Sequence, residues 1–145
     1  MKKNIDPSNI NLKIKAVEII AFNLTPIDIK SKPFNTFHFN VKINQTFSSE
    51  KQLVFILPHV EIIHEDKKTK LGSITISCIF QIDEINNYLD TKTKNINLPE
   101  TIVRTLHSIS LSTCRGVMVS QFNGTFLHNA ILPLIDPNSF SDNKK

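Results

Sequence analysis

The stretch PETIVRTLHSISLSTCRGVMVSQF, residues 99–122, decides the fold, because it is the one segment whose pattern indicates a long helix. Pro99 suits the first position of a helix, and Asn123 with Gly124 is a typical exit. At 100° per residue, the apolar side chains fill an arc of roughly 220°. An amphipathic surface helix needs only about half of that, so the pattern predicts a helix covered on two sides. The apolar residues are Ile102, Val103, Leu106, Ile109, Leu111, Cys114, Val117, Met118 and Phe122.

The remaining strip of this helix holds small side chains and two arginines. Small side chains let a second helix approach closely, and arginines find acceptors on it. Since one chain offers a single sheet, the second side of the helix is expected to meet a symmetry mate. The expected oligomer contacts are Arg104, Ser108, Ser112 and Arg115. The alternative, a helix buried under loops of its own chain, stays open.

Four strands are predicted before the helix. Residues 11–24 alternate with a one-residue slip near Lys15 and Ala16, which indicates a β-bulge. Residues 36–47 alternate cleanly, as in a half-buried strand. A third strand starts at Lys51, and a fourth covers residues 73–80 after a turn. With no helix between them, the strands form an antiparallel sheet.

The third strand differs from the others, because the run from Leu53 to Leu57 is apolar at every position. Both of its faces are expected to be covered, and Pro58 is expected to interrupt the ladder. Residues 83–97 are polar and predict a connector with one turn near residues 85–89. The fold class is therefore α+β: a four-stranded antiparallel sheet, one long helix, an apolar crossover loop and a short C-terminal segment.

Length and charge predict one soluble domain. The 145 residues suffice for a single core, with residues 1–10 and 141–145 as flexible tails. The net charge of +4 falls to about +1 without the four terminal lysines and Asp142, so no nucleic-acid partner is expected. The basic turn EDKKTK, residues 65–70, is interpreted as solvated. No signal-like or membrane-length apolar run is found, so the chain is expected in the cytoplasm without membrane insertion.

The sequence offers little for catalysis. The five His are scattered without metal-ligand spacing, the 3 Gly form no phosphate loop, and Cys78 and Cys114 are expected as buried thiols. His107 and Ser108 point about 100° apart on the helix, so they cannot pair. We therefore expect no enzyme, no metal and no cofactor.

The segment QFNGTFLHNAILPLIDP, residues 121–137, is strongly apolar although Gly and Pro forbid a long helix there. Its motifs carry a resemblance. The order of elements along nearly the whole chain resembles SecB, the bacterial export chaperone, and the SecB-like chaperones of toxin–antitoxin systems. Most specific are Cys114-Arg115-Gly116, Asn123-Gly124-Thr125-Phe126, Leu132-Pro133 and Asp136-Pro137-Asn138-Ser139-Phe140.

The resemblance implies a homotetramer whose first helices lie between two sheets. It also implies an ATP-independent holdase that binds unfolded polypeptides in apolar grooves, where one Leu-sized contact contributes roughly 2 kcal/mol. The implied groove residues are Leu53, Phe55, Leu57, Phe126, Leu127, Ile131, Leu132, Leu134 and Ile135.

Two departures narrow the implied partners. SecB proteins of the export pathway are acidic and end in a longer helix and a zinc-carrying tail that contacts SecA, whereas this chain is basic and ends at Ser141-Asp-Asn-Lys-Lys. SecA docking is therefore not expected. Export and a toxin–antitoxin module, with an antitoxin as client, both stay open. The alternative function is a scaffold that uses the apolar loop as a fixed interface with one folded partner.

Overall fold

The computed structural model describes residues 11–25 and 36–136. The expected flexible tails, residues 1–10 and 141–145, and the motif at residues 137–140 lie outside the described residues. The elements are β1 (Leu12–Leu24), β2 (Phe37–Ser48), β3 (Leu53–His64), β4 (Lys70–Ile82), the 3₁₀ turn η2 (Ile85–Tyr88) and α1 (Glu100–Gln121). Each strand and the helix match the sequence prediction to within a few residues at their ends.

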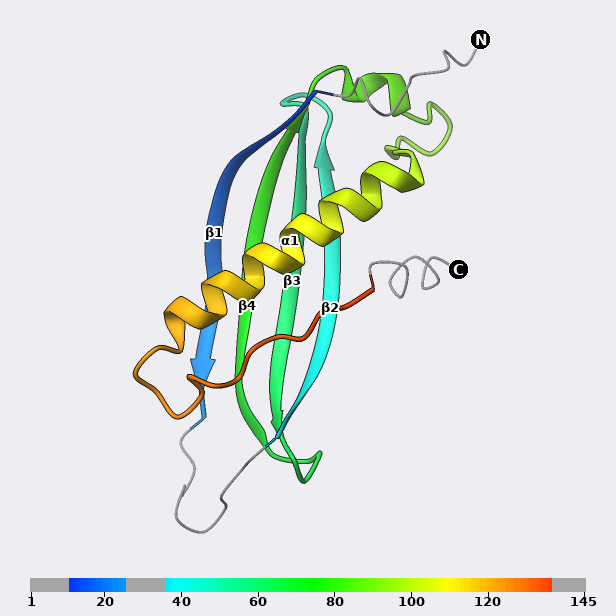
Figure 1. Cartoon of the computed structure of the whole chain (residues 1–145). Helices are drawn as coiled ribbons and strands as arrows, with labels where there is room; N and C mark the ends of the chain where they lie inside the picture. The colour runs from blue at the N-terminus through cyan, green and yellow to red at the C-terminus, as the bar shows by residue number, and fades with distance from the viewer. Residues whose placement is uncertain (1–10, 26–35, 137–145) are drawn as a thin grey trace.

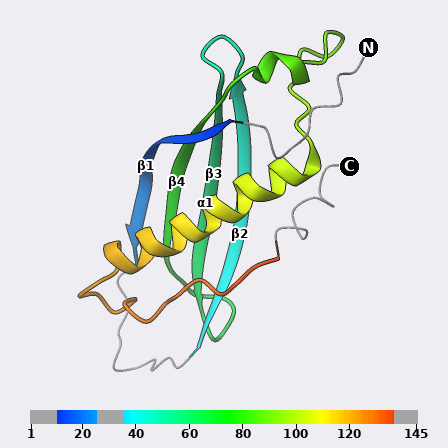
Figure 2. The same cartoon turned by 45° about the horizontal axis from the view of Figure 1, so that its top comes forward.

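The four strands form one antiparallel sheet in the order β1-β4-β3-β2. Helix α1 runs diagonally across one face of this sheet, and the segment after it returns across the same face (Figure 1). The turned view in Figure 2 shows the same two layers. The predicted α+β architecture is confirmed.

Alternation along β3 separates the two faces of the sheet. Val54, Ile56, Val60 and Ile62 are fully buried and belong to the core with the helix. The odd-numbered side chains of β3 point to the opposite face, because successive strand residues alternate. The described chain therefore covers only one face of a strand that was expected to be covered on both.

Two irregularities of the sheet were anticipated. The register of β1 shifts between Ile14 and Ala16, which confirms the predicted bulge. Pro58 interrupts the ladder less than expected: β3 continues through it, with Pro58 opposite Ile43 of β2. On the other side, pairing with β4 passes from Ile56 to His59. A proline lacks only its own amide hydrogen, so the ladder is weakened on one side alone.

The apolar arc of helix α1 is largely covered within the single chain. Of the nine apolar residues in its 220° arc, only Ile109 is exposed, while the others are buried or half-buried within the single chain. The physical reason is that the chain folds back after the helix and adds Leu127, Ala130 and Leu132 to the same core. Coverage by the helix's own chain therefore explains most of this burial, and the contact with a symmetry mate stays a prediction.

Gly72 of β4 accepts the close approach of two neighbouring segments. A Cβ added there would lie 2.8 Å from the backbone oxygen of Asn23 and 2.8 Å from Leu127 Cδ1. The first contact is with backbone of the edge strand and the second with a buried side chain of the segment after the helix. Gly72 thus lets that segment pack directly on the sheet.

We expect Gly72→Ala to destabilise the protein by about 1–3 kcal/mol, because the added methyl group overpacks a site walled by backbone. Urea unfolding followed by circular dichroism measures this difference. Gly116→Ala is the matched control, since a Cβ at that helix position meets nothing within 4 Å. It should be neutral or stabilising. Equal stability of Gly72→Ala and wild type would contradict the close approach.

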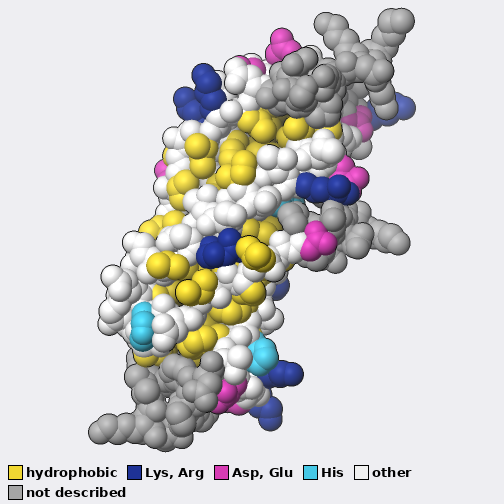
Figure 3. Space-filling model, in the orientation of Figure 1, with side chains coloured by type: hydrophobic (Ala, Val, Ile, Leu, Met, Phe, Trp, Pro, Cys, Tyr) yellow, Lys and Arg dark blue, Asp and Glu magenta, His cyan; other side chains and the backbone are white. Residues whose placement is uncertain are grey.

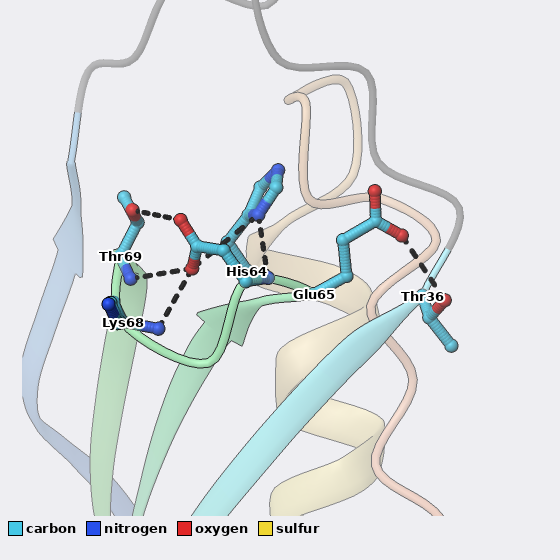
Figure 4. Close-up of polar contacts among 6 residues, drawn as sticks. Thr36, His64, Glu65, Lys68 and Thr69 are labelled. Carbon is cyan, nitrogen blue, oxygen red and sulfur yellow. Dashed lines mark hydrogen bonds and ion pairs between the residues drawn. The ribbon is translucent and has the colours of Figure 1, made fainter.

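The turn between β3 and β4 is closed by a carboxylate, and Figure 4 shows its polar contacts. Asp66 Oδ1 accepts hydrogen bonds from the amides of Lys68 and Thr69 at 2.8 and 2.9 Å, and Oδ2 accepts from Thr69 Oγ1 at 2.7 Å. These bonds hold the pKa of Asp66 well below its usual value of 3.8. Lys67 and Lys68 are exposed, so the predicted solvated turn is confirmed.

A lowered carboxyl pKa contributes stability above the ordinary value, and this contribution is lost as pH falls toward the folded-state pKa. We therefore expect Asp66→Ala to be less stable than wild type at pH 7, with the gap narrowing once the pH drops below 3.8. Urea unfolding between pH 7 and pH 2 measures the gap. Glu65→Ala removes a neighbouring carboxylate as control. A gap that stays constant with pH would contradict the assignment.

Candidate functional site

The segment after α1, residues 122–136, is here called the crossover loop. Gly124, at a φ of 80°, turns the chain out of the helix. Thr125 Oγ1 then donates to the carbonyl of Phe122 at 2.7 Å and accepts from the amide of Leu127 at 3.1 Å. Phe122 packs on Phe22 of β1 with ring centroids 5.2 Å apart. The start of the crossover loop is therefore held to both the helix and the sheet.

Arg115 fastens the later part of the crossover loop to the helix. Its Nε donates to the carbonyl of Leu132 at 2.6 Å, and its terminal NH2 group donates to the carbonyl of Pro133 at 2.9 Å. Two adjacent carbonyls are thus held by one guanidinium, whose planar fork suits paired acceptors. The loop has no regular backbone ladder at residues 130–136, so this contact fixes it in place.

The crossover loop turns its apolar side chains in two directions. Leu127, Ala130 and Leu132 are buried in the core. Ile131 and Leu134 point outward, with 55% and 91% of their surfaces exposed. Figure 3, which views this side of the molecule, shows hydrophobic side chains in several groups around the helix. A firmly held loop thus presents apolar side chains to solvent.

The nine residues predicted to line the groove do not form one surface in the described chain. Leu53, Phe55 and Leu57 are half-buried on the sheet face that points away from the helix. The crossover loop lies on the helix side (Figure 1). Within the loop, two predicted residues are core, Phe126 and Ile135 are half-buried, and Ile131 and Leu134 are exposed. Sequence pattern could not separate them, because a run that is apolar at every position does not reveal which face each side chain takes.

The four predicted oligomer residues also lie in different surroundings. Ser108 and Ser112 lie exposed on the outer side of α1, and so does Arg104, which pairs with Glu100 at 2.7 Å. Arg115 is engaged with the crossover loop of its own chain. Two apolar residues, Ile109 and Val119, share the outer strip and are 40% and 47% exposed.

The edge strand β1 is a further apolar region that the sequence did not single out. Within the described part of the chain, it pairs with β4 on one side and with no strand on the other. Ile14, Val17, Ile19 and Ile20 are all exposed. An edge strand with exposed apolar side chains offers unpaired backbone and apolar contact to another chain. Only the strand order, which a single sequence does not state, identifies β1 as an edge.

A polar network on the outer sheet face was also missed. His59 Nδ1 lies 2.6 Å from Thr75 Oγ1, and His59 Nε2 lies 3.5 Å from Glu61 Oε1. Glu61 is bonded more closely to Lys70, at 2.9 Å, and that bond lowers the pKa of the Glu61 carboxyl. With its carboxylate held by Lys70, the group resembles a cross-strand ion network more than an activated nucleophile.

The two thiols are confirmed as buried, free cysteines. Burial raises the pKa of Cys78, and burial with the nearby Cys78 raises the pKa of Cys114 to about 12, so both stay protonated at neutral pH. Among the described residues, no three His, Cys, Asp or Glu side chains are grouped to hold a metal ion. Within residues 11–25 and 36–136, no helix combines the length and apolarity needed to cross a bilayer.

Comparison with known proteins supports the fold. No protein-family profile and no curated protein matches this chain in sequence. Among solved structures, the chain is similar to the Mycobacterium tuberculosis SecB-like chaperone Rv1957, solved in complex with a ChAD peptide from the Rv1956 HigA1 antitoxin. The TM-score is 0.53 at 9% identity, and the match covers 86% of this chain and 90% of the other. The fold is therefore SecB-like, as the sequence predicted.

Proposed function

We propose that this protein is an ATP-independent holdase chaperone that binds nonnative polypeptides through apolar side chains on its surface. The observation that carries the proposal is the crossover loop, which is fastened to the core yet exposes Leu134 and Ile131 to solvent. Exposed apolar groups that are built in this way are typical of interaction surfaces.

The proposed binding surface begins at the crossover loop and includes its half-buried residues, Phe126 and Ile135. Leu53, Phe55 and Leu57 supply a second surface on the opposite sheet face. Each contact is weak, since a fully buried Leu-sized side chain contributes roughly 2 kcal/mol. A client long enough to touch both surfaces gains from their combination. No cofactor and no catalytic step enter this proposal.

The SecB-like fold supports the same function, and it suggests a class of client. The similar solved chaperone holds a peptide from an antitoxin. An antitoxin segment is therefore a candidate client here, in a toxin–antitoxin module or beside a role in export. The basic chain does not favour SecA as a partner. The sequence-based expectation of a cytoplasmic protein is part of the proposal.

We also propose a homotetramer. The outer strip of α1 carries the small side chains of Ser108 and Ser112 with the exposed Ile109 and Val119, so a second helix can approach it closely. The edge of β1 offers a second contact surface. Together the two surfaces supply the two different interfaces that a pair of dimers needs. Light scattering that shows a monomer at micromolar concentration would contradict this assembly.

Aggregation assays test the chaperone proposal. The purified protein should suppress aggregation of several unrelated, chemically unfolded clients at a near-stoichiometric ratio and without ATP. Suppression should weaken little at high salt, because apolar contacts and not charges hold the client. Unchanged aggregation of every client would contradict the proposal.

The scaffold alternative is supported by the contacts that hold the crossover loop in place, since its exposed Ile131 and Leu134 would then form a fixed interface. A scaffold would bind one folded partner tightly and leave unrelated unfolded clients to aggregate. Selectivity for folded or unfolded protein therefore separates the two functions.

A further inference from the structure

We infer that Arg115 is a positioning residue, which holds the crossover loop so that Ile131 and Leu134 stay available for a bound polypeptide. The inference deepens the proposed function and rests on it for the identity of the bound partner. The part of the inference that concerns positioning rests on the contacts between Arg115 and the crossover loop, whatever the protein binds.

The geometry places Arg115 where it controls the exposed residues. The two carbonyls that it binds, those of Leu132 and Pro133, lie between Ile131 and Leu134 in sequence. Leu132 is 1% exposed, so this point of the loop is fixed both by its buried side chain and by its carbonyl. The two apolar residues that flank these carbonyls in sequence lie exposed. Ile131 is 55% and Leu134 is 91% exposed.

The hydrogen bonds described for the rest of the loop act on other parts of it. The early part of the loop is held by Thr125 and by the amide of Ala130, which donates to the carbonyl of Leu127 at 2.9 Å. The amide of Ile131 donates to the carbonyl of Asn129 at 3.0 Å. Both of these bonds are local to the loop. The guanidinium of Arg115 ties the backbone around Leu132 to the rigid helix, and one side chain donates both bonds.

Without the Arg115 guanidinium, we expect Ile131 and Leu134 to fold onto the nearest exposed apolar surface of the protein. Ile131 and Leu134 would then be shielded by the protein itself in part of the population. A client would have to displace them, which lowers the apparent affinity by the fraction of molecules in the open form. Arg115 therefore contributes to binding without touching the client.

The test uses the full chain with Arg115→Met, which keeps an apolar stem of similar length, and Arg115→Lys, which keeps the charge but not the fork. Arg104→Met is the matched control, because Arg104 lies on the same helix and, among the described residues, pairs with the exposed Glu100 and not with the crossover loop. Hydrogen exchange is measured at the amides of Ala130 and Ile131. Affinity is measured by fluorescence anisotropy with one labelled, permanently unfolded polypeptide, and the fold is checked by circular dichroism.

We expect Arg115→Met to speed exchange at these two amides by about tenfold and to weaken binding about fivefold, with the helical spectrum retained. Arg115→Lys should fall between Arg115→Met and wild type, and Arg104→Met should leave the exchange of these two amides as it is in wild type. Unchanged loop exchange in Arg115→Met would overturn the inference. So would a loosened loop that binds the polypeptide as tightly as wild type.

The two levels of the proposal fail separately. Hydrogen exchange decides whether Arg115 holds the loop, whatever the protein binds. A wild-type protein that binds no unfolded polypeptide would overturn the proposed function and, with it, the role of Arg115 in client binding, even when the exchange result is positive.

Discussion

Replacing Ile131 and Leu134 by Asp in one variant is expected to weaken the binding of unfolded clients by at least about tenfold. Each Leu-sized contact that is fully buried by a client contributes roughly 2 kcal/mol, and a tenfold change in affinity corresponds to about 1.4 kcal/mol. Even partial burial of both side chains therefore exceeds this threshold. Both side chains are exposed in the free protein, so the fold should not depend on them. Fluorescence anisotropy with a labelled unfolded polypeptide measures the loss.

The added charge needs its own control. Asn129 lies on the same loop and is exposed, and Asn129→Asp adds a carboxylate without removing an apolar side chain. This variant should bind clients nearly as well as wild type. If Asn129→Asp weakens binding as much as the double substitution, charge and not apolar contact would explain the effect.

Phe122→Ala is expected to destabilise the protein by about 3–5 kcal/mol, the largest stability effect we predict. Phe122 is 1% exposed and stands where α1 ends and the crossover loop begins. It also packs on the ring of Phe22, so its removal leaves a cavity between the helix end and the edge strand. Urea unfolding followed by circular dichroism gives the difference in the free energy of unfolding.

Phe122→Leu is the matched variant for volume. It keeps most of the apolar bulk but loses the aromatic contact, and it should recover more than half of the stability lost in Phe122→Ala. A loss below about 1 kcal/mol for Phe122→Ala would mean that the helix end is not packed as described.

The fold was predictable because the sequence pattern agrees with it at several levels. Alternation in residues 36–47 and the slip near Lys15 predicted the strands and the bulge, and Gly124 predicted the end of the helix. Coverage of the helix was not predictable. The periodicity of α1 shows which side chains avoid water but not what shields them, and the shield includes Leu127 and Leu132 from a segment with no regular pattern.

The candidate site was predicted only in part. The sequence predicted the exposed Ile131 and Leu134 as groove residues, but it predicted the buried Leu127 and Leu132 in the same way. A loop lacks the fixed period that separates buried from exposed side chains. Arg115 was noticed as a basic residue on the helix strip, but its partners are carbonyl oxygens, which no side-chain pattern reports. The network around His59 depends on the register between β3 and β4. The apolar patterns of these two strands in the sequence do not determine that register.

We propose that this SecB-like fold binds nonnative chains through apolar side chains that its own core holds outward. The test measures how tightly the wild-type protein binds one labelled polypeptide at equilibrium, once in its folded state and once in a permanently unfolded state. A holdase should bind the unfolded state with micromolar or tighter affinity and should not measurably bind the folded state. Equal binding of both states, or none of either, would contradict it.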